Sequence, residues 1–123
     1  MLKALIIIWI GSGLGGTLRY MVQELVLRSF HTVYPLGTFL INIFGSFCIG
    51  VFFVISERYN WMTSEWRWFL ITGLCGGFTT FSSFSYENIS LLKQGDYLYF
   101  VLYLFLSVTL GLLATFLGTL TIK

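Results

Sequence analysis

Charged side chains are scarce in this chain. They make up only 10% of its 123 residues, whereas 57% of the residues are hydrophobic. A soluble domain typically has about 25% charged residues, and a domain of this size leaves much of its surface in water. The chain has too few charges to cover such a surface, which excludes an ordinary soluble domain. The composition indicates that lipid is the solvent.

Residues that would support several other functions are missing as well. The net charge of +2 is small and dispersed, so there is no basic patch for nucleic acid. There is no metal-ligand spacing, no Walker loop and no dinucleotide-binding fingerprint after a strand. The two cysteines, Cys48 and Cys75, lie inside apolar stretches and are expected to be free thiols. No nucleophile–base pair appears, and we predict that the protein is not an enzyme.

Four hydrophobic stretches are long enough to cross a membrane. A transmembrane helix needs about 20 apolar residues, and the stretches cover residues 4–27, 36–56, 66–92 and 97–122. The connections between them are too short to hold a soluble domain. We therefore predict an all-α membrane protein, with residues 1–123 forming a single four-helix transmembrane domain whose function lies within the membrane.

The positive charges at the two ends of these spans are nearly balanced. The side with both termini carries Lys3, Arg58, Arg67 and Lys123; the other carries Arg28 and Lys93, with Arg19 nearby. Orientation in the membrane follows an excess of Lys and Arg on one side. Because the excess is small here, the chain is compatible with insertion in both orientations.

Small residues recur at the spacing that lets helices approach closely in lipid. The ridges are Gly11 and Gly15, then Ser46 and Gly50, then Ser107, Gly111 and Thr115. Each ridge is compatible with packing inside one chain. Four helices, however, shield a polar path poorly, so a pore in this protein favours an oligomer.

The third span has an unusual centre, the run from Gly76 to Ser85. Two adjacent glycines precede two threonines, although glycine costs about 1 kcal/mol in a helix interior relative to alanine. One interpretation is a broken helix, which membranes tolerate only inside protein or beside a water-filled cavity. Its freed carbonyl groups would suit a cation. The other interpretation is a continuous helix whose hydroxyls bond back to the chain.

Phe78, Phe81 and Phe84 recur at every third residue beside these hydroxyls. An aromatic stripe in a membrane helix usually packs or faces lipid. A phenyl ring also carries a positive edge, and ring edges that line a narrow path can contact a small anion without holding it tightly.

Three further polar residues each have two interpretations. Arg19 either faces a protein or water-filled interior or reaches the far interface, about 24 Å from Lys3 at 1.5 Å per residue. Asn42 either offers an amide donor to a hydrated anion or bonds to a neighbouring helix. Glu87 either shapes a vestibule or marks the membrane interface.

Three runs match the signatures of a known family. They are Gly15–Tyr20 (GGTLRY), Gly37–Ser46 (GTFLINIFGS) and Gly73–Ser85 (GLCGGFTTFSSFS). In length, number of spans and order of motifs, the whole chain resembles the Fluc (CrcB) family of fluoride ion channels. The run in the third span is the most specific.

This resemblance implies a passive fluoride channel of the bacterial cell inner membrane, multi-pass, which releases fluoride from the cytoplasm and relieves its toxicity. It implies an antiparallel, dual-topology homodimer with two pores. A structural sodium ion is implied at the dimer centre, held by the backbone carbonyl groups of Gly76 and Thr79 from each subunit. The implied partners are thus a second copy of the chain, fluoride and the lipid bilayer, without nucleic acid or an organic cofactor.

The resemblance also implies roles for single residues. Phe81 and Phe84 match the phenylalanines whose ring edges face fluoride, and Asn42 matches the pore asparagine. Arg19 matches an arginine that favours anions near the vestibule. Hydroxyl groups along the same path are expected from Thr80, Ser83, Tyr103 and Ser107. No pore role is implied for Phe78.

Other readings stay open. Small proton-coupled multidrug exporters are also four-helix dimers, but they need a carboxylate inside the first span, where this chain has Arg19 and, toward the end, Glu24. A structural or assembly subunit would have no use for costly intramembrane groups such as Asn42. A dimer of two different chains remains an alternative to the homodimer.

Overall fold

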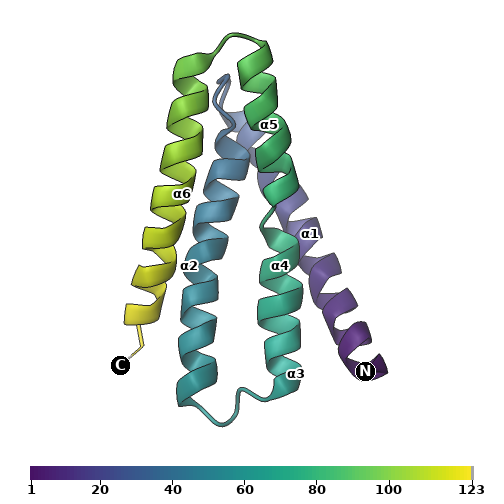
Figure 1. Cartoon of the computed structure of the whole chain (residues 1–123). Helices are drawn as coiled ribbons and strands as arrows, with labels where there is room; N and C mark the ends of the chain where they lie inside the picture. The colour runs from purple at the N-terminus through teal and green to yellow at the C-terminus, as the bar shows by residue number, and fades with distance from the viewer. Residues whose placement is uncertain (123) are drawn as a thin grey trace.

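The computed structural model describes residues 1–122, and every regular element within them is a helix (Figure 1). Three long helices, α1 (Leu2–Ser29), α2 (Leu36–Arg58) and α6 (Tyr97–Leu120), have the length and hydropathy to cross a membrane. The prediction of an all-α membrane protein is confirmed. Lys123, which entered the charge balance, lies outside the described residues.

The third span consists of consecutive pieces instead of one helix. It begins with α3 (Ser64–Arg67) and continues through a π-helix, η1 (Trp68–Cys75), to α4 (Gly76–Phe78). Two extended residues follow, and α5 (Phe81–Lys93) completes the span. A π-helix is rare and widens the turn to an i→i+5 hydrogen bond; nothing in the sequence pattern predicted it.

Proline and glycine shape the two connections at one end of the molecule. Pro35, the only proline, directly precedes α2, where its missing N–H costs no helical hydrogen bond. Gly95 has a φ of +79°, a conformation that favours glycine, and turns the chain between α5 and α6. Both termini and the connection 59–63 lie at the opposite end (Figure 1).

Glycines bring the helices together in two pairs. On α1, a Cβ at Gly15 would collide with the carbonyl oxygen of Leu74 in η1. On α2, a Cβ at Gly50 would collide with the carbonyl oxygen of Thr115 in α6. The predicted ridges of small residues therefore serve packing within the chain. The pair of α2 and α6 diverges from the third span and α1 toward the end that holds the termini (Figure 1).

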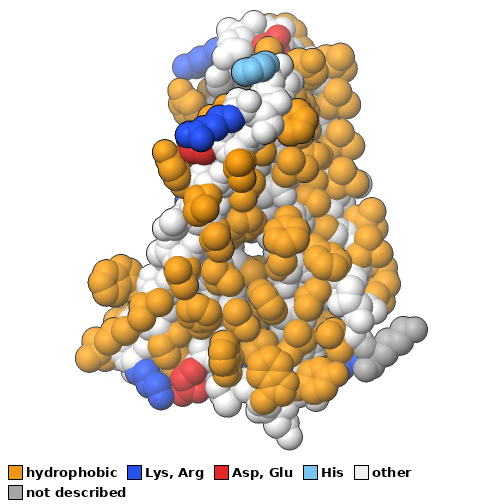
Figure 2. All heavy atoms as spheres, turned by 180° about the vertical axis from the view of Figure 1, so that it is seen from behind, with side chains coloured by type: hydrophobic (Ala, Val, Ile, Leu, Met, Phe, Trp, Pro, Cys, Tyr) orange, Lys and Arg blue, Asp and Glu red, His pale blue; other side chains and the backbone are white. Residues whose placement is uncertain are grey.

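The outer surface is apolar between two charged ends. Figure 2 shows hydrophobic side chains over most of one face, with charged side chains gathered near the two ends. Trp9, for example, is 76% exposed. At the end with the termini, Lys3 Nζ lies 3.3 Å from Glu65 Oε1; at the other, Arg28 and Glu24 are 3.9 Å apart. This distribution is that of a protein whose sides face lipid.

Candidate functional site at the break in the third span

The third span is broken at Thr79 and Thr80. Thr79 has φ −83° and ψ 159°, and Thr80 has φ −149° and ψ 121°, so both residues are extended. The helix α4 ends immediately before them and α5 begins immediately after. The structure thus decides between the two interpretations of this segment in favour of the interrupted helix.

Asn42 on α2 pairs with the backbone of the break. Its Nδ2 donates to the carbonyl oxygen of Thr80 at 3.0 Å, and its Oδ1 accepts from the N–H of Thr80 at 2.9 Å. These bonds satisfy both backbone groups that the interruption frees at this residue. A primary amide has two N–H donors, and the second one of Asn42 has no partner among residues 1–122. Asn42 therefore links α2 to the break in the third span and has one N–H free to bind another group.

Thr80 also starts the second half of the span. Its hydroxyl accepts from the backbone N–H of Ser83 at 3.1 Å, which is an N-cap of α5, and lies 3.3 Å from the hydroxyl of Ser82. Threonine is among the preferred N-cap residues. The positive end of the α5 dipole consequently lies at the break.

Most of the carbonyl groups around the break have donors. The carbonyl of Cys75 accepts from both the N–H and the hydroxyl of Thr79, at 3.0 and 2.9 Å. The carbonyl of Gly77 accepts from Arg19 Nε at 3.1 Å. Within residues 1–122 no protein donor reaches the carbonyl groups of Gly76 and Thr79. The subunit itself therefore offers no donor to these two backbone carbonyl groups at the break.

Arg19 lies at the break and not at the far interface. Its guanidinium group is half-buried and binds the carbonyl of Gly77, near the C-terminal end of α4. A cation is favourable at the negative end of a helix. Of the two interpretations of Arg19, the structure supports a group that faces the protein interior.

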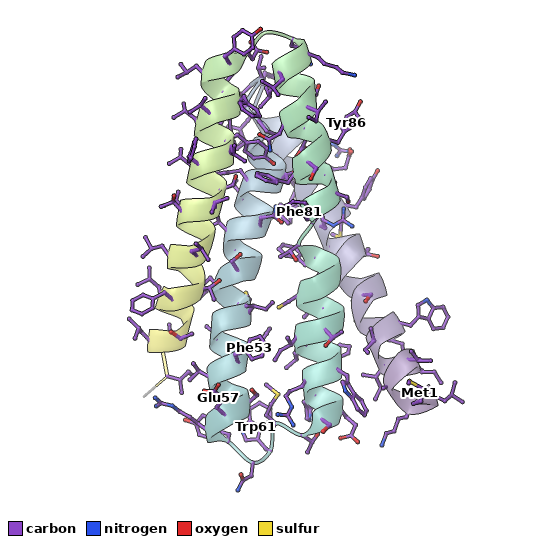
Figure 3. The ribbon with its side chains drawn as sticks, in the orientation of Figure 1. Met1, Phe53, Glu57, Trp61, Phe81 and Tyr86 are labelled. Atoms are coloured by element: carbon purple, nitrogen blue, oxygen red, sulfur yellow. The ribbon has the colours of Figure 1, made fainter. Side chains whose placement is uncertain are left out.

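A cavity of about 240 Å³ opens at the break, lined by Asn42, Gly45, Ser46, Ile49, Thr79, Thr80 and Phe81. The Phe81 side chain, labelled in Figure 3, is 78% exposed, while Phe84 is 9% exposed. The centroids of the two rings are 5.8 Å apart and the rings are tilted by 46°. The pair therefore reaches from the open side of the cavity into the protein interior.

Phe78 does not continue this pair. Because the helix breaks after it, Phe78 belongs to α4 and meets Phe44 edge-on, with ring centroids 6.2 Å apart. It lines a separate apolar cavity together with Cys48 and Cys75, both of which are free thiols. The stripe of three phenylalanines expected on a continuous helix is thus divided between two segments.

Farther along α5, hydrogen bonds connect residues from all four spans. Thr38 on α2 donates to Glu87 Oε2, and Tyr103 on α6 donates to Glu87 Oε1, both at 2.9 Å. Gln23 on α1 donates from Nε2 to the hydroxyl oxygen of Thr38 at 2.9 Å. Thr38 and Tyr103 are fully buried. Glu87 is thus half-buried and hydrogen-bonded to two neighbouring spans, as a residue that shapes a vestibule would be.

Tyr103 and Ser107 bring α6 to the same region. The ring of Tyr103 lies against Phe84, with centroids 5.0 Å apart. The hydroxyl of Ser107, one turn farther along α6, is buried without a hydrogen-bond partner in the described residues. A buried polar group without a partner is costly, so this hydroxyl is a candidate for contact with a water molecule or an ion.

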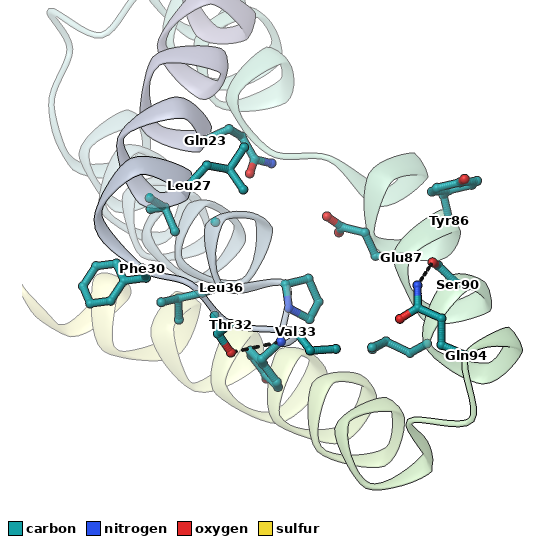
Figure 4. A pocket seen from close by; sticks show the side chains of 15 residues that line it. Gln23, Leu27, Phe30, Thr32, Val33, Leu36, Tyr86, Glu87, Ser90 and Gln94 are labelled. Carbon is teal, nitrogen blue, oxygen red and sulfur yellow. Dashed lines mark hydrogen bonds between the residues drawn. The ribbon is translucent and has the colours of Figure 1, made fainter.

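A second cavity, of about 260 Å³, lies beyond Glu87 between α1, the connection 30–35 and α5 (Figure 4). Its polar lining includes Gln23, Thr32, Tyr34, Glu87 and Gln94. Burial raises the pKa of Tyr34, whose hydroxyl therefore stays neutral. The Phe81–Phe84 pair, Tyr103 and Glu87 form a continuous series of contacts from the first cavity to the second.

A family model described as "CrcB-like protein, Camphor Resistance (CrcB)" matches residues 6–119. The chain belongs to the CrcB family. Among its relatives, a protein of Azobacteroides pseudotrichonymphae is 42% identical over 118 residues, covering 96% of this chain and 94% of the relative. One from Flavobacterium psychrophilum is 45% identical over 122 residues (99% and 98%), and one from Bacteroides fragilis is 46% identical over 120 residues (95% and 94%). All three are named fluoride-specific ion channel FluC.

Membership of the CrcB family confirms the resemblance that the three sequence runs indicated. Because this is a family of ion channels, the prediction that the protein is not an enzyme is confirmed. The bacterial relatives and the long apolar helices confirm a multi-pass membrane protein of bacteria. The structure gathers Asn42, Thr80 and Phe81 at one cavity of this CrcB protein. Beyond this cavity, Phe84, Tyr103 and Glu87 lie one after another in space, each in contact with the next.

Proposed function

We propose that this protein is a passive, fluoride-selective channel that lets fluoride leave the bacterial cytoplasm through the cell inner membrane and so relieves its toxicity. The names of relatives that are 42–46% identical over nearly the whole chain support this function. The observation that carries it is the arrangement at the break, where a free N–H of Asn42 and the ring of Phe81 line one cavity.

The chemistry of this cavity suits a small, strongly hydrated anion. Phenyl ring edges are weakly positive, and an amide N–H is an uncharged donor. Together with the positive end of α5, they replace part of the hydration shell of fluoride without the strong hold of a full positive charge. We assign the path to Asn42, Phe81 and Phe84, with hydroxyl contributions from Thr80, Ser83, Tyr103 and Ser107.

The charged residues have supporting roles in this proposal. Arg19 raises the local potential for anions at the vestibule beside the break while it holds the carbonyl of Gly77. Glu87 organises the interior beyond the phenylalanine pair by accepting hydrogen bonds from Thr38 and Tyr103. Since both carboxylate oxygens already have donors, Glu87 can lie beside an anion path without a bare negative oxygen facing it.

A single subunit leaves the path unfinished, and we infer that two copies assemble as an antiparallel homodimer with two pores. Phe81 is 78% exposed, so one side of the cavity lacks a wall. One end of the molecule carries Lys3, Arg58 and Arg67, and the other carries Arg28 and Lys93, so the two ends differ little in positive charge. This weak bias supports insertion in both orientations.

We further propose a structural sodium ion at the dimer centre. The carbonyl groups of Gly76 and Thr79 have no protein donor within residues 1–122, and hard cations prefer oxygen ligands of this kind. Two copies of the chain would supply four such oxygens. The ion would also offset the negative ends of the two α4 segments.

Fluoride efflux from liposomes that contain the purified protein tests the function. A fluoride electrode reads release after an ionophore collapses the membrane potential, and chloride-loaded vesicles test selectivity. We expect rapid fluoride release without chloride release. A Phe81→Ile variant should lose the release, whereas Phe105→Ile should retain it, because Phe105 is an exposed residue of α6 that lines neither cavity. Absence of fluoride release from folded wild-type protein would refute the proposal.

A further inference from the structure

Gln23 on α1 has a donor that the protein does not use. Its Nε2 gives one N–H to the hydroxyl oxygen of Thr38 at 2.9 Å. A primary amide carries two such hydrogens, and the second has no acceptor among residues 1–122. Gln23 lines the cavity of about 260 Å³ at the end of the molecule opposite the termini.

The bond from Gln23 also fixes the direction of the chain of hydrogen bonds beyond it. A hydroxyl has one hydrogen. Because Thr38 accepts from Gln23, its own hydrogen is free to point at Glu87 Oε2, 2.9 Å away. A threonine in a helix otherwise tends to bond back to its own backbone. Gln23 therefore keeps Glu87 satisfied as well as lining the cavity.

The backbone of α2 makes room for this arrangement at Gly37. A Cβ on that residue would collide with Oε1 of Gln23, so the amide rests directly on the helix next to Thr38. In Figure 4 the amide of Gln23 and the carboxylate of Glu87 point toward each other across the cavity. The amide is thus held in place at the cavity floor.

Gln23 and Asn42 line the two cavities that the contacts of the phenylalanine pair connect. Each amide donates one N–H to a protein acceptor and has a second N–H without a protein partner among residues 1–122. Each also lines its own cavity. Between the cavities run the contacts from Phe81 through Phe84 to Tyr103 and then to Glu87. Although both oxygens of Glu87 accept hydrogen bonds, the carboxylate keeps its negative charge, so an anion that passes the rings toward it needs a donor there.

We propose that Gln23 is that donor: its free N–H binds fluoride on the far side of the Phe81–Phe84 pair, as the second amide contact of each pore. This inference rests on the channel function proposed above. The cavity lined by Gln23 and Glu87 is then the second mouth of the path. There fluoride leaves its contacts with the phenyl rings and is hydrated again.

A methionine substitution tests the role of the amide. Gln23→Met keeps the length of the side chain and removes both N–H donors. We expect fluoride efflux from liposomes to fall by at least about tenfold. The control is Asn60→Leu, which also removes a side-chain amide but is exposed and lines neither cavity; it should conduct as the wild type does. Wild-type efflux from Gln23→Met would overturn the proposal and leave the channel function intact, whereas a silent wild type would refute the channel function itself.

A second measurement avoids any change in the protein. Fluoride titrated into ¹⁵N-labelled wild-type protein in detergent should shift the side-chain amide signals of Gln23, with chloride producing no such shift. The chain has two glutamines, so the Gln23 signals are assigned as those that remain in Gln94→Met labelled only at glutamine. No shift at fluoride concentrations that saturate efflux would overturn the proposal, even if Gln23→Met failed to fold.

Discussion

Asn42 and Thr80 are joined as two neighbouring strands would be, although one partner is a side chain. The amide oxygen and nitrogen of Asn42 meet the N–H and the carbonyl of Thr80 at 2.9 and 3.0 Å. In a membrane, freed backbone groups must find partners inside the protein. The side chain of Asn42 therefore stabilises the interruption of the third span by supplying these partners. It does so at the cavity where we place the anion.

Replacement of Asn42 by aspartate should impair both the support of the break and the binding of the anion, because both depend on the N–H groups of the amide. Asn42→Asp retains an acceptor for the N–H of Thr80 but loses the donor to its carbonyl and adds a negative charge. An unsatisfied buried acceptor costs about 1–3 kcal/mol, and we expect a lower unfolding temperature in detergent. Fluoride efflux should fall by more than about tenfold.

The same substitution at Asn60 is the control. Asn60 is exposed in the connection 59–63, away from both cavities. Asn60→Asp should leave both the unfolding temperature and the fluoride efflux unchanged. Efflux at the wild-type rate from Asn42→Asp would contradict the position given to the anion.

The contact between α2 and α6 should tolerate no side chain at Gly50. A Cβ there would collide with the carbonyl oxygen of Thr115. Overpacking of this kind costs roughly 1–3 kcal/mol, so Gly50→Ala should lower the temperature at which the protein unfolds in detergent. Gly13→Ala, where a Cβ meets nothing within 4 Å, should raise it slightly, since alanine favours helix by about 1 kcal/mol. Equal effects of the two changes would refute this packing.

Removal of sodium tests the proposed ion. The protein is purified and assayed with N-methylglucamine in place of sodium. We expect fluoride efflux to fall by at least about tenfold and to recover when sodium is returned. Thr79→Ser should respond in the same way, because the proposed ligand is the backbone carbonyl and serine keeps the hydroxyl bonded to Cys75. Efflux that is indifferent to sodium in both proteins would exclude a required ion.

The three long helices α1, α2 and α6 could be predicted from the sequence because hydropathy and length alone decide them. The break could not. Gly76, Gly77, Thr79 and Thr80 are compatible with both a broken and a continuous helix, and local preference is too weak to decide. The deciding partner is Asn42, 38 residues away in the chain, and nothing in the sequence says which amide meets which backbone group.

Arg19, Gln23 and Thr38 show the same limit in the site. The family resemblance implied an arginine near the vestibule, but the bond from Arg19 to the Gly77 carbonyl depends on how α1 crosses the third span. Gln23 and Thr38 were overlooked, although each is a polar residue inside an apolar span, and that signal was available. What no pattern gives is the depth at which they meet Glu87, because depth follows from helix tilt and packing.

Ser107 allows a test in which stability and transport respond differently. Its hydroxyl is buried and has no partner in the described residues, so Ser107→Ala breaks no protein hydrogen bond. We expect the unfolding temperature in detergent to stay the same or to rise, while fluoride efflux falls severalfold because the path loses a donor. Thr115→Val provides the contrast, since the hydroxyl of Thr115 donates to the carbonyl of Ser46 at 3.0 Å. That change should cost about 1 kcal/mol of stability. If Ser107→Ala destabilised the protein as much as Thr115→Val does, its hydroxyl would have a structural partner, and its place in the path would be refuted.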